Sequence, residues 1–211
     1  MATTLAAIQM YRILIAVLAA CGAVLVVGGS LDGQEPRNLS REEAARQLER
    51  KLERISKAGA TEYRGGTIIV DEAEINAYFE SAIVESMIEG LDALNVTLRE
   101  GGLVSVEAVI DFSSLEEERL RGGLELLNYL SGRVPVRFDG SISGRDGIGI
   151  VSVEGFTVAG LPLPASVFRE LVRSYTASID VLEGIDVLQA FELPYGIMEL
   201  KIDHGQVEIL Q

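Results

Sequence analysis

Apolar and polar residues alternate with a period of two in paired segments around short turns, and this pattern constrains the fold most. In segment 103–112, Val104 and Ala108 fall on one face, whereas Ser105 and Glu107 fall on the other. Every second side chain of a strand shares a face, so the pattern predicts strands with one buried and one wetter side. The paired segments are 94–98 with 103–112, 134–142 with 148–158, and 198–202 with 207–209. Each pair predicts an antiparallel hairpin.

Four other segments have apolar residues at helical spacing, or start signals typical of helices: 40–57, 71–88, 113–130 and 164–175. Ser40 with Glu43, and Asp71 with Glu74, have the spacing of capping boxes. Pro164 suits the first turn of a helix. We therefore expect an α+β fold in which a curved antiparallel sheet of long hairpins wraps around or packs on helices. Gly-rich strand segments such as 140–149 allow the strong bending that such a sheet needs.

The composition excludes several classes of protein. Among 211 residues, 32 are acidic and 18 are basic, and the net charge of −14 disfavours binding to nucleic acid. A single Cys and a single His exclude cysteine-based zinc sites, a disulfide framework and any catalytic site with two His. We interpret His204 as an exposed turn residue, and the acidic run 116–118 as the solvated first turn of a helix. We therefore expect no cofactor, no metal and no enzymatic activity.

The N-terminal part carries an apolar run, 13–27, without a charge or an amide side chain. This predicts an anchor or signal segment over 1–29, a tether over 30–39 and a single α+β domain over 40–211. Arg12 precedes the run and Asp32 follows it, so the N-terminus is expected in the cytoplasm and the domain outside, periplasmic or extracellular. The run reads as an uncleaved single-pass transmembrane helix, as a lipoprotein signal lipidated at Cys21, or as a cleaved secretory signal.

The segment 40–57 differs in charge from the rest of the chain. It carries six basic and four acidic residues, whereas 58–211 carries 10 basic and 26 acidic residues. A basic helix beside a bilayer could touch anionic headgroups. The alternative is a solvated helix face with ion pairs between residues four positions apart.

The order of these elements resembles that of small bacterial envelope proteins with one copy of the tubular lipid-binding fold. That superfamily includes the bactericidal/permeability-increasing protein and the synaptotagmin-like lipid-binding domains. The resemblance is carried by the segments DEAEINAYF at 71–79, LPLP at 161–164 and LPYGI at 193–197. It implies a curved sheet that wraps a long helix and encloses an apolar channel for acyl chains. It also implies lipid handling rather than catalysis, and it transfers no catalytic residue.

Two apolar helix faces are the candidate ligand-binding residues, with plain core packing as the alternative. They are Ile75, Tyr78, Phe79, Ile83 and Met87 on the first helix, and Val167, Phe168, Leu171, Val172 and Tyr175 on the second. The leading hypothesis is a membrane-anchored extracytoplasmic domain that buries a lipid or another long apolar molecule. The alternative is a non-enzymatic envelope scaffold with a filled core that acts through protein partners. An apolar cavity would favour the first hypothesis, and a filled sheet–helix interface would favour the second.

Overall fold

A computed structural model of the chain describes residues 40–59, 66–84, 91–113, 131–176 and 186–211. The apolar run 13–27, Cys21, the tether 30–39, Met87 and the expected helix 113–130 lie outside these residues, apart from Ser113. The expected helices 40–57 and 164–175, the expected helix 71–88 as far as residue 84, and all three expected hairpins lie within them.

The described elements follow one another in an order that mixes helices and strands. They are α2 (Arg41–Gly59), β1 (Ile68–Asp71), α3 (Glu72–Val84), β2 (Leu91–Leu98), the 3₁₀ turn η1 (Glu100–Gly102), β3 (Leu103–Asp111), β4 (Arg133–Arg145), β5 (Ile148–Val158), β6 (Leu161–Pro162), α4 (Ala165–Thr176), β7 (Phe191–Glu192), the 3₁₀ turn η4 (Pro194–Gly196), β8 (Glu199–Asp203) and β9 (Gln206–Leu210). The predicted hairpins are therefore confirmed as β2–β3, β4–β5 and β8–β9.

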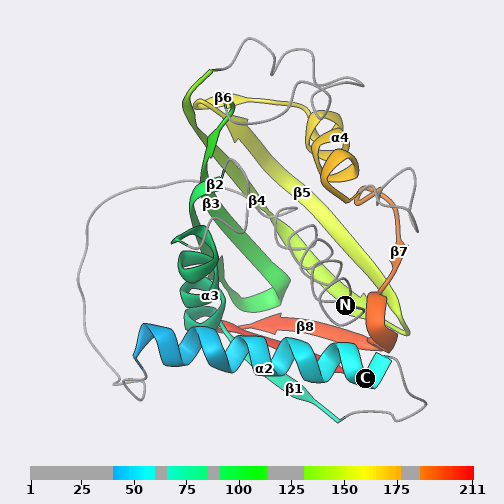
Figure 1. Ribbon diagram of the computed structural model, residues 1–211. Coiled ribbons are helices and arrows are strands. Elements are labelled where there is room, and N and C mark those ends of the chain that lie inside the picture. Colours follow the sequence, from blue (N-terminus) through cyan, green and yellow to red (C-terminus); the bar gives the residue numbers. More distant parts are fainter. Residues whose placement is uncertain (1–39, 60–65, 85–90, 114–130, 177–185) are drawn as a thin grey trace.

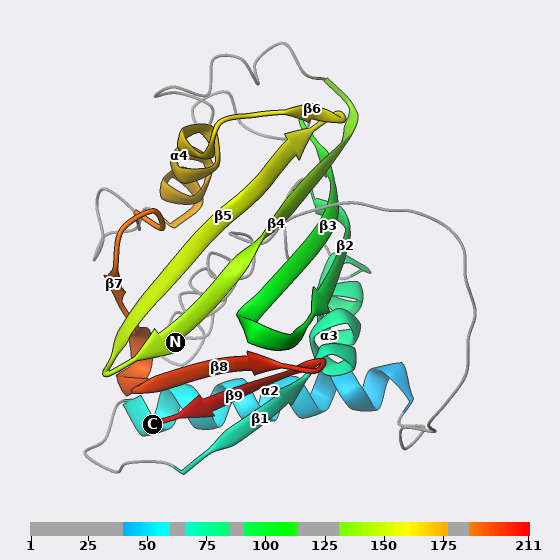
Figure 2. The ribbon, with the colours of Figure 1, turned by 180° about the vertical axis from the view of Figure 1, so that it is seen from behind.

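All the strand pairs within the described residues are antiparallel and belong to one curled sheet. Strands β2, β3, β4 and β5 form its long part, and β1, β9 and β8 form a short part that crosses the end of the long one (Figures 1 and 2). The two parts join where Gly144 of β4 pairs with Leu200 of β8. The expected α+β class with a curved antiparallel sheet is thus confirmed, and the sheet has the shape of a half-barrel.

Tight turns with two central residues connect β4 to β5, β5 to β6 and β8 to β9. Their central pairs are Asp146–Gly147, Ala159–Gly160 and His204–Gly205, and all six residues have a positive φ. Two positive φ values define the turn whose twist matches that of the flanking strands, and glycine adopts the second at little cost. The short turn expected between segments 134–142 and 148–158 and the turn expected at His204 are confirmed at Asp146–Gly147 and His204–Gly205.

The capping boxes are visible as hydrogen bonds. The backbone N–H of Glu43 donates to Ser40 Oγ at 3.3 Å, and the backbone N–H of Asp71 donates to Glu74 Oε2 at 2.9 Å. All five apolar positions of the expected N-terminal helix are buried in α2, namely Ala44, Ala45, Leu48, Leu52 and Ile55. One detail of the alternation differs from the expectation, since Ser105 on the wetter face is only 7% exposed. It is covered because its hydroxyl is hydrogen-bonded to Arg99 and Asp139.

The edge of β2 is covered by side chains of α3. The Asn76 side chain donates to Val96 O at 2.9 Å and accepts from Val96 N at 2.7 Å, as the backbone of a neighbouring strand would. A carboxylate oxygen of Glu72 accepts from Leu98 N at 2.6 Å. Unpaired strand edges invite association with other chains, and these bonds prevent it at this edge. They also fix α3 beside the C-terminal end of β2.

Candidate functional site

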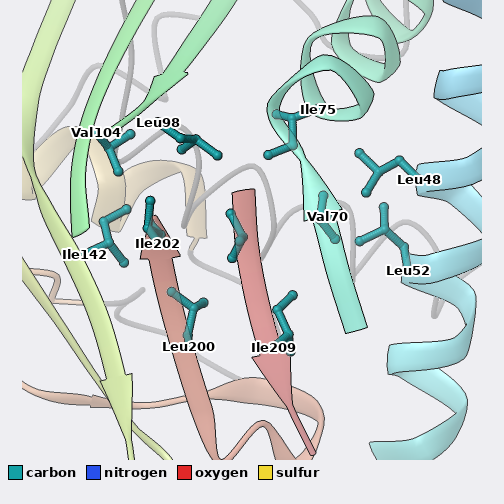
Figure 3. Close-up of a pocket in the computed structure, with 11 residues that line it drawn as sticks. Leu48, Leu52, Val70, Ile75, Leu98, Val104, Ile142, Leu200, Ile202 and Ile209 are labelled. Carbon is teal, nitrogen blue, oxygen red and sulfur yellow. The ribbon is translucent and has the colours of Figure 1, made fainter. Parts of the chain in front are cut away.

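An apolar cavity of about 60 Å³ lies between α2 and the inner face of the sheet, where the two sheet parts meet (Figure 3). Its lining is Leu48 and Leu52 from α2, Val70 from β1, Ile75 from α3, Leu98 from β2, Val104 from β3, Ile142 from β4, Leu200 and Ile202 from β8, and Val207 and Ile209 from β9. Every one of these side chains is aliphatic, and no polar atom contributes to the cavity surface.

Strand alternation explains why these side chains converge. Ile202 of β8 pairs with Val207 of β9, and Leu200 pairs with Ile209, so all four point to one face of the short sheet part. Leu48 and Leu52 are one helical turn apart and share a face of α2 that points to the same space. Gly144 permits the close approach of β8, since a Cβ on this residue would lie 3.0 Å from the Cβ of Leu200. The cavity is the place where these apolar faces meet without filling the space.

Polar contacts hold α2 at the margins of this apolar interface. Lys51 Nζ lies 2.6 and 2.5 Å from the two carboxylate oxygens of Glu74, whose side chain is almost fully buried. At the other end of α2, Gln211 Nε2 donates to Ile55 O at 2.8 Å and to Tyr195 O at 2.7 Å. A Cβ on Gly59 would lie 2.5 Å from the Cα of Tyr195, so only glycine fits there without a shift of η4. These contacts hold α2 in position over the cavity.

Of the predicted ligand-binding residues on α3, only Ile75 lines the cavity. Phe79 is buried, and Tyr78 is half-buried and meets the Phe79 ring edge-on at 5.9 Å. Ile83 is half-buried, and Met87 lies outside the described residues. Most of this helix face within the described residues packs into the core.

The predicted residues on α4 lie in a different part of the core. Phe168 is fully buried, with its ring stacked on Phe138 at 4.7 Å and inclined to Phe156 at 5.3 Å. Three further predicted residues are buried with it, namely Val167, Leu171 and Val172. The side chain of Tyr175 lies outside the described part of the structure. Of the four predicted α4 residues whose side chains are described, none contributes to the cavity lining.

Sequence reasoning missed most of the cavity lining as a site. Among the lining residues it named Ile75 as a candidate ligand-binding residue and placed Val104 on the apolar face of a strand. No local signal shows that α2 covers β8 and β9, because those elements are about 150 residues apart in the chain. The usable signal is the pronounced amphipathicity of 41–59, which requires an apolar surface to cover.

The largest described cluster of charged side chains lies on the opposite face of the long sheet part. Arg137 donates to Asp139 at 2.6 and 3.0 Å and to Glu107 at 3.2 Å, and Ser105 Oγ donates to Asp139 at 2.7 Å. The hydrogen bonds from Arg137 hold the pKa of Asp139 below its ordinary value, whereas burial raises the pKa of Glu107. This arrangement is a cross-strand ion-pair ladder, and it stabilises the pairing of β3 with β4.

The single His occupies the β8–β9 turn, as expected. Its side chain is exposed and lies within ion-pair distance of Glu100 in η1 and, at 2.8 Å, of Asp203. Across the described ranges, no group of three or more His, Cys, Asp and Glu residues is arranged to hold a metal ion. His204 therefore joins two turns of the sheet rather than a cluster of ligands.

Comparisons with known proteins give no relative. No protein-family model, no curated protein and no solved structure matches this chain. Within 40–59, 66–84, 91–113, 131–176 and 186–211, no helix is long and apolar enough to cross a membrane. Any functional assignment therefore depends on the sequence pattern and on the geometry of the apolar cavity.

Proposed function

We propose that this chain is a non-enzymatic, membrane-anchored extracytoplasmic domain that binds a lipid acyl chain or another long apolar ligand. One observation carries the proposal. The cavity under α2 is lined by carbon alone, and it lies on the concave side of a curled sheet. A site for an acyl chain needs an apolar lining and few polar groups. The apolar run 13–27 would keep this site near the bilayer from which such a ligand comes.

In its present volume the cavity admits only the tip of a chain. Its volume is about 60 Å³. Pockets for drug-sized ligands occupy roughly 300–1,000 Å³. Binding of a longer chain therefore requires α2 to move outward from β8 and β9.

The apolar lining favours such a movement. Separating Leu48 and Leu52 from the strands uncovers only carbon in the cavity, and at its margin it breaks the hydrogen bond from Gln211 to Ile55 O. An inserted acyl chain restores the lost burial at about 0.8 kcal/mol per CH₂ group. The ion pair between Lys51 and Glu74 can persist as a pivot at one side of α2.

A photoactivatable fatty acid, fed to cells that produce the full chain, tests this proposal. After irradiation, peptides of the purified protein are mapped by mass spectrometry. We expect cross-links at the cavity lining on α2, β8 and β9, in addition to any in the apolar run 13–27. Val207→Phe, which fills the cavity, is expected to remove the cross-links to α2. Phe168→Leu, a core change away from the cavity, is the matched control and is expected to retain them.

Cross-links confined to 13–27 in a folded protein would overturn the lipid proposal. They would favour the second candidate, an envelope scaffold that acts through protein partners. Two observations favour this second candidate. The cavity is small, and the rings of Phe138, Phe156 and Phe168 pack closely against one another. A scaffold needs no internal space, and its function would lie on its surface.

A further inference from the structure

The two halves of α2 are attached to the domain by different contacts. The first half packs on α3, where Ala45 and Ala77 belong to one buried cluster (Figure 1). At the middle of α2, Lys51 pairs with Glu74, which is only 2% exposed and has both carboxylate oxygens hydrogen-bonded. Separating this pair would leave a buried charge without its partner, which is strongly unfavourable. The first half of α2 is therefore held firmly in place.

The second half of α2 is held by an uncharged side chain. Gln211, which follows β9, donates from Nε2 to Ile55 O at 2.8 Å and to Tyr195 O of η4 at 2.7 Å. The other end of the same amide is not satisfied, since Gln211 Oε1 is buried and has no hydrogen-bond partner among the described residues. A buried acceptor that has lost its water without gaining a donor is unfavourable. This contact therefore holds α2 over the cavity at a cost that the first half of the helix does not carry.

The backbone that Gln211 contacts in η4 has a strained conformation. Tyr195 has a φ of +57° and a ψ of +26°, in the left-handed region that bulky side chains rarely adopt. The last residue of α2 touches the same place, because a Cβ on Gly59 would lie 2.5 Å from the Cα of Tyr195. Strained backbone persists only where its surroundings hold it. Departure of the end of α2 would release Tyr195 and return Gln211 Oε1 to water.

We propose that Gln211 latches α2 over the cavity, and that the second half of the helix swings away from β9 and η4 when this contact opens. The pair of Lys51 and Glu74 is the pivot of the swing. Leu52 follows the pivot in α2 and lines the cavity, so the swing uncovers the apolar lining and admits an acyl chain beside the second half of the helix. The inference rests on the proposed function for the identity of the ligand, but the movement itself requires no ligand.

Thiol labelling of the full chain in nanodiscs measures this movement. In a Cys21→Ser background, Val207→Cys places a thiol in the cavity lining on β9. Val106→Cys places a thiol on β3, at a fully buried position outside that lining. A local opening exposes little surface, so we expect the labelling rate at position 207 to depend weakly on low concentrations of urea. Labelling at position 106 requires unfolding of the domain, and its rate is expected to rise steeply with urea.

Gln211→Glu is expected to release the latch, because a carboxylate cannot donate to Ile55 O or Tyr195 O and is repelled by both. At a pH well above the ordinary pKa of a carboxyl group, the labelling rate at position 207 without urea is expected to rise about tenfold, with its weak urea dependence retained. Gln189→Glu makes the same change at an exposed site outside α2, η4 and β9, and it is expected to leave the rate unchanged.

The half of α2 that moves is identified by a third thiol. Ala45→Cys lies on the half held by α3, and its labelling is expected to show the steep urea dependence of position 106. An unchanged rate at position 207 in Gln211→Glu, or an equal rise in Gln189→Glu, would overturn the latch. A steep urea dependence at position 207, or a weak one at position 45, would overturn the swing. Failure of the fatty-acid cross-link would leave these rates unaffected, so the two proposals are tested separately.

Discussion

At the residue scale, single polar side chains complete the sheet where strands end. Asn76 replaces a missing strand at the edge of β2, because both of its side-chain bonds go to the backbone of Val96. Val96 is fully buried, so its backbone groups have no access to water once Asn76 is removed. This residue therefore acts on sheet closure rather than on the cavity.

Replacing Asn76 with Ala is expected to lower the free energy of unfolding by about 1–3 kcal/mol, since it leaves a buried donor and acceptor unpaired. Urea unfolding followed by circular dichroism measures the change. Asn95→Ala is the matched control, because Asn95 is exposed on the same strand, and its effect is expected within about 0.5 kcal/mol. Equal losses in the two variants would contradict the role assigned to Asn76.

The lowered pKa of Asp139 predicts that the stability of the fold depends on pH. Its pKa in the folded state lies below the ordinary value of 3.8, chiefly because Arg137 donates to it. A lowered folded pKa means that the charged carboxylate stabilises the fold above that value, and this contribution is lost as the pH falls through the folded pKa. Asp139→Asn is therefore expected to be less stable than the wild type by about 1 kcal/mol at neutral pH, with a deficit that shrinks below pH 3.8.

Urea midpoints of the two proteins across that pH range measure the deficit. Asp146→Asn serves as the control, because Asp146 is exposed in a hairpin turn and Asn readily adopts the positive φ of this position. A deficit for Asp139→Asn that stays constant with pH would show that the ion-pair ladder contributes no charge-dependent stability.

At the scale of elements, the position of α2 depends on its contacts with neighbouring elements as much as on its apolar face. The end of the helix touches η4 so closely that a Cβ on Gly59 would meet the Tyr195 backbone at 2.5 Å. Backbone atoms cannot move aside as the end of a flexible side chain can. The position of α2 over the cavity therefore depends on a glycine at its last residue.

Gly59→Ala is expected to destabilise the protein by about 1–3 kcal/mol, the usual effect of overpacking. Thermal unfolding of the purified chain gives the change. A Cβ on Gly66 would meet no atom within 4 Å, so Gly66→Ala is expected to be neutral and provides the comparison. A neutral result for Gly59→Ala would mean that α2 is not fixed against η4.

The elements were largely predictable from the sequence, but their partners were not. Alternation around 144–147 predicted β4 and β5 because strand faces are a local property. The pairing of β1 with β9, and of Gly144 with Leu200, joins distant segments that carry no register signal of their own. The candidate site was missed for the same reason. The apolar faces of α3 and α4 indicate from the sequence only that these residues are buried. The cavity itself lies elsewhere, where α2, β8 and β9 meet.

At the scale of the whole molecule, one amphipathic helix, α2, covers an apolar part of the concave face of the sheet. The proposed ligand site starts from the cavity under Leu48 and Leu52, and the proposal requires α2 to move away from β8 and β9.

Native mass spectrometry of the full chain, purified from cell membranes, tests the central claim most directly. We expect the spectrum to show a fraction of the protein with one bound lipid or fatty acid, which solvent extraction releases and identifies. Val207→Phe is expected to remove that fraction while thermal unfolding shows that the variant is folded. A wild-type protein that is ligand-free, and stays so when lipids are added in excess, would contradict the account and leave a compact envelope domain without a carrier function.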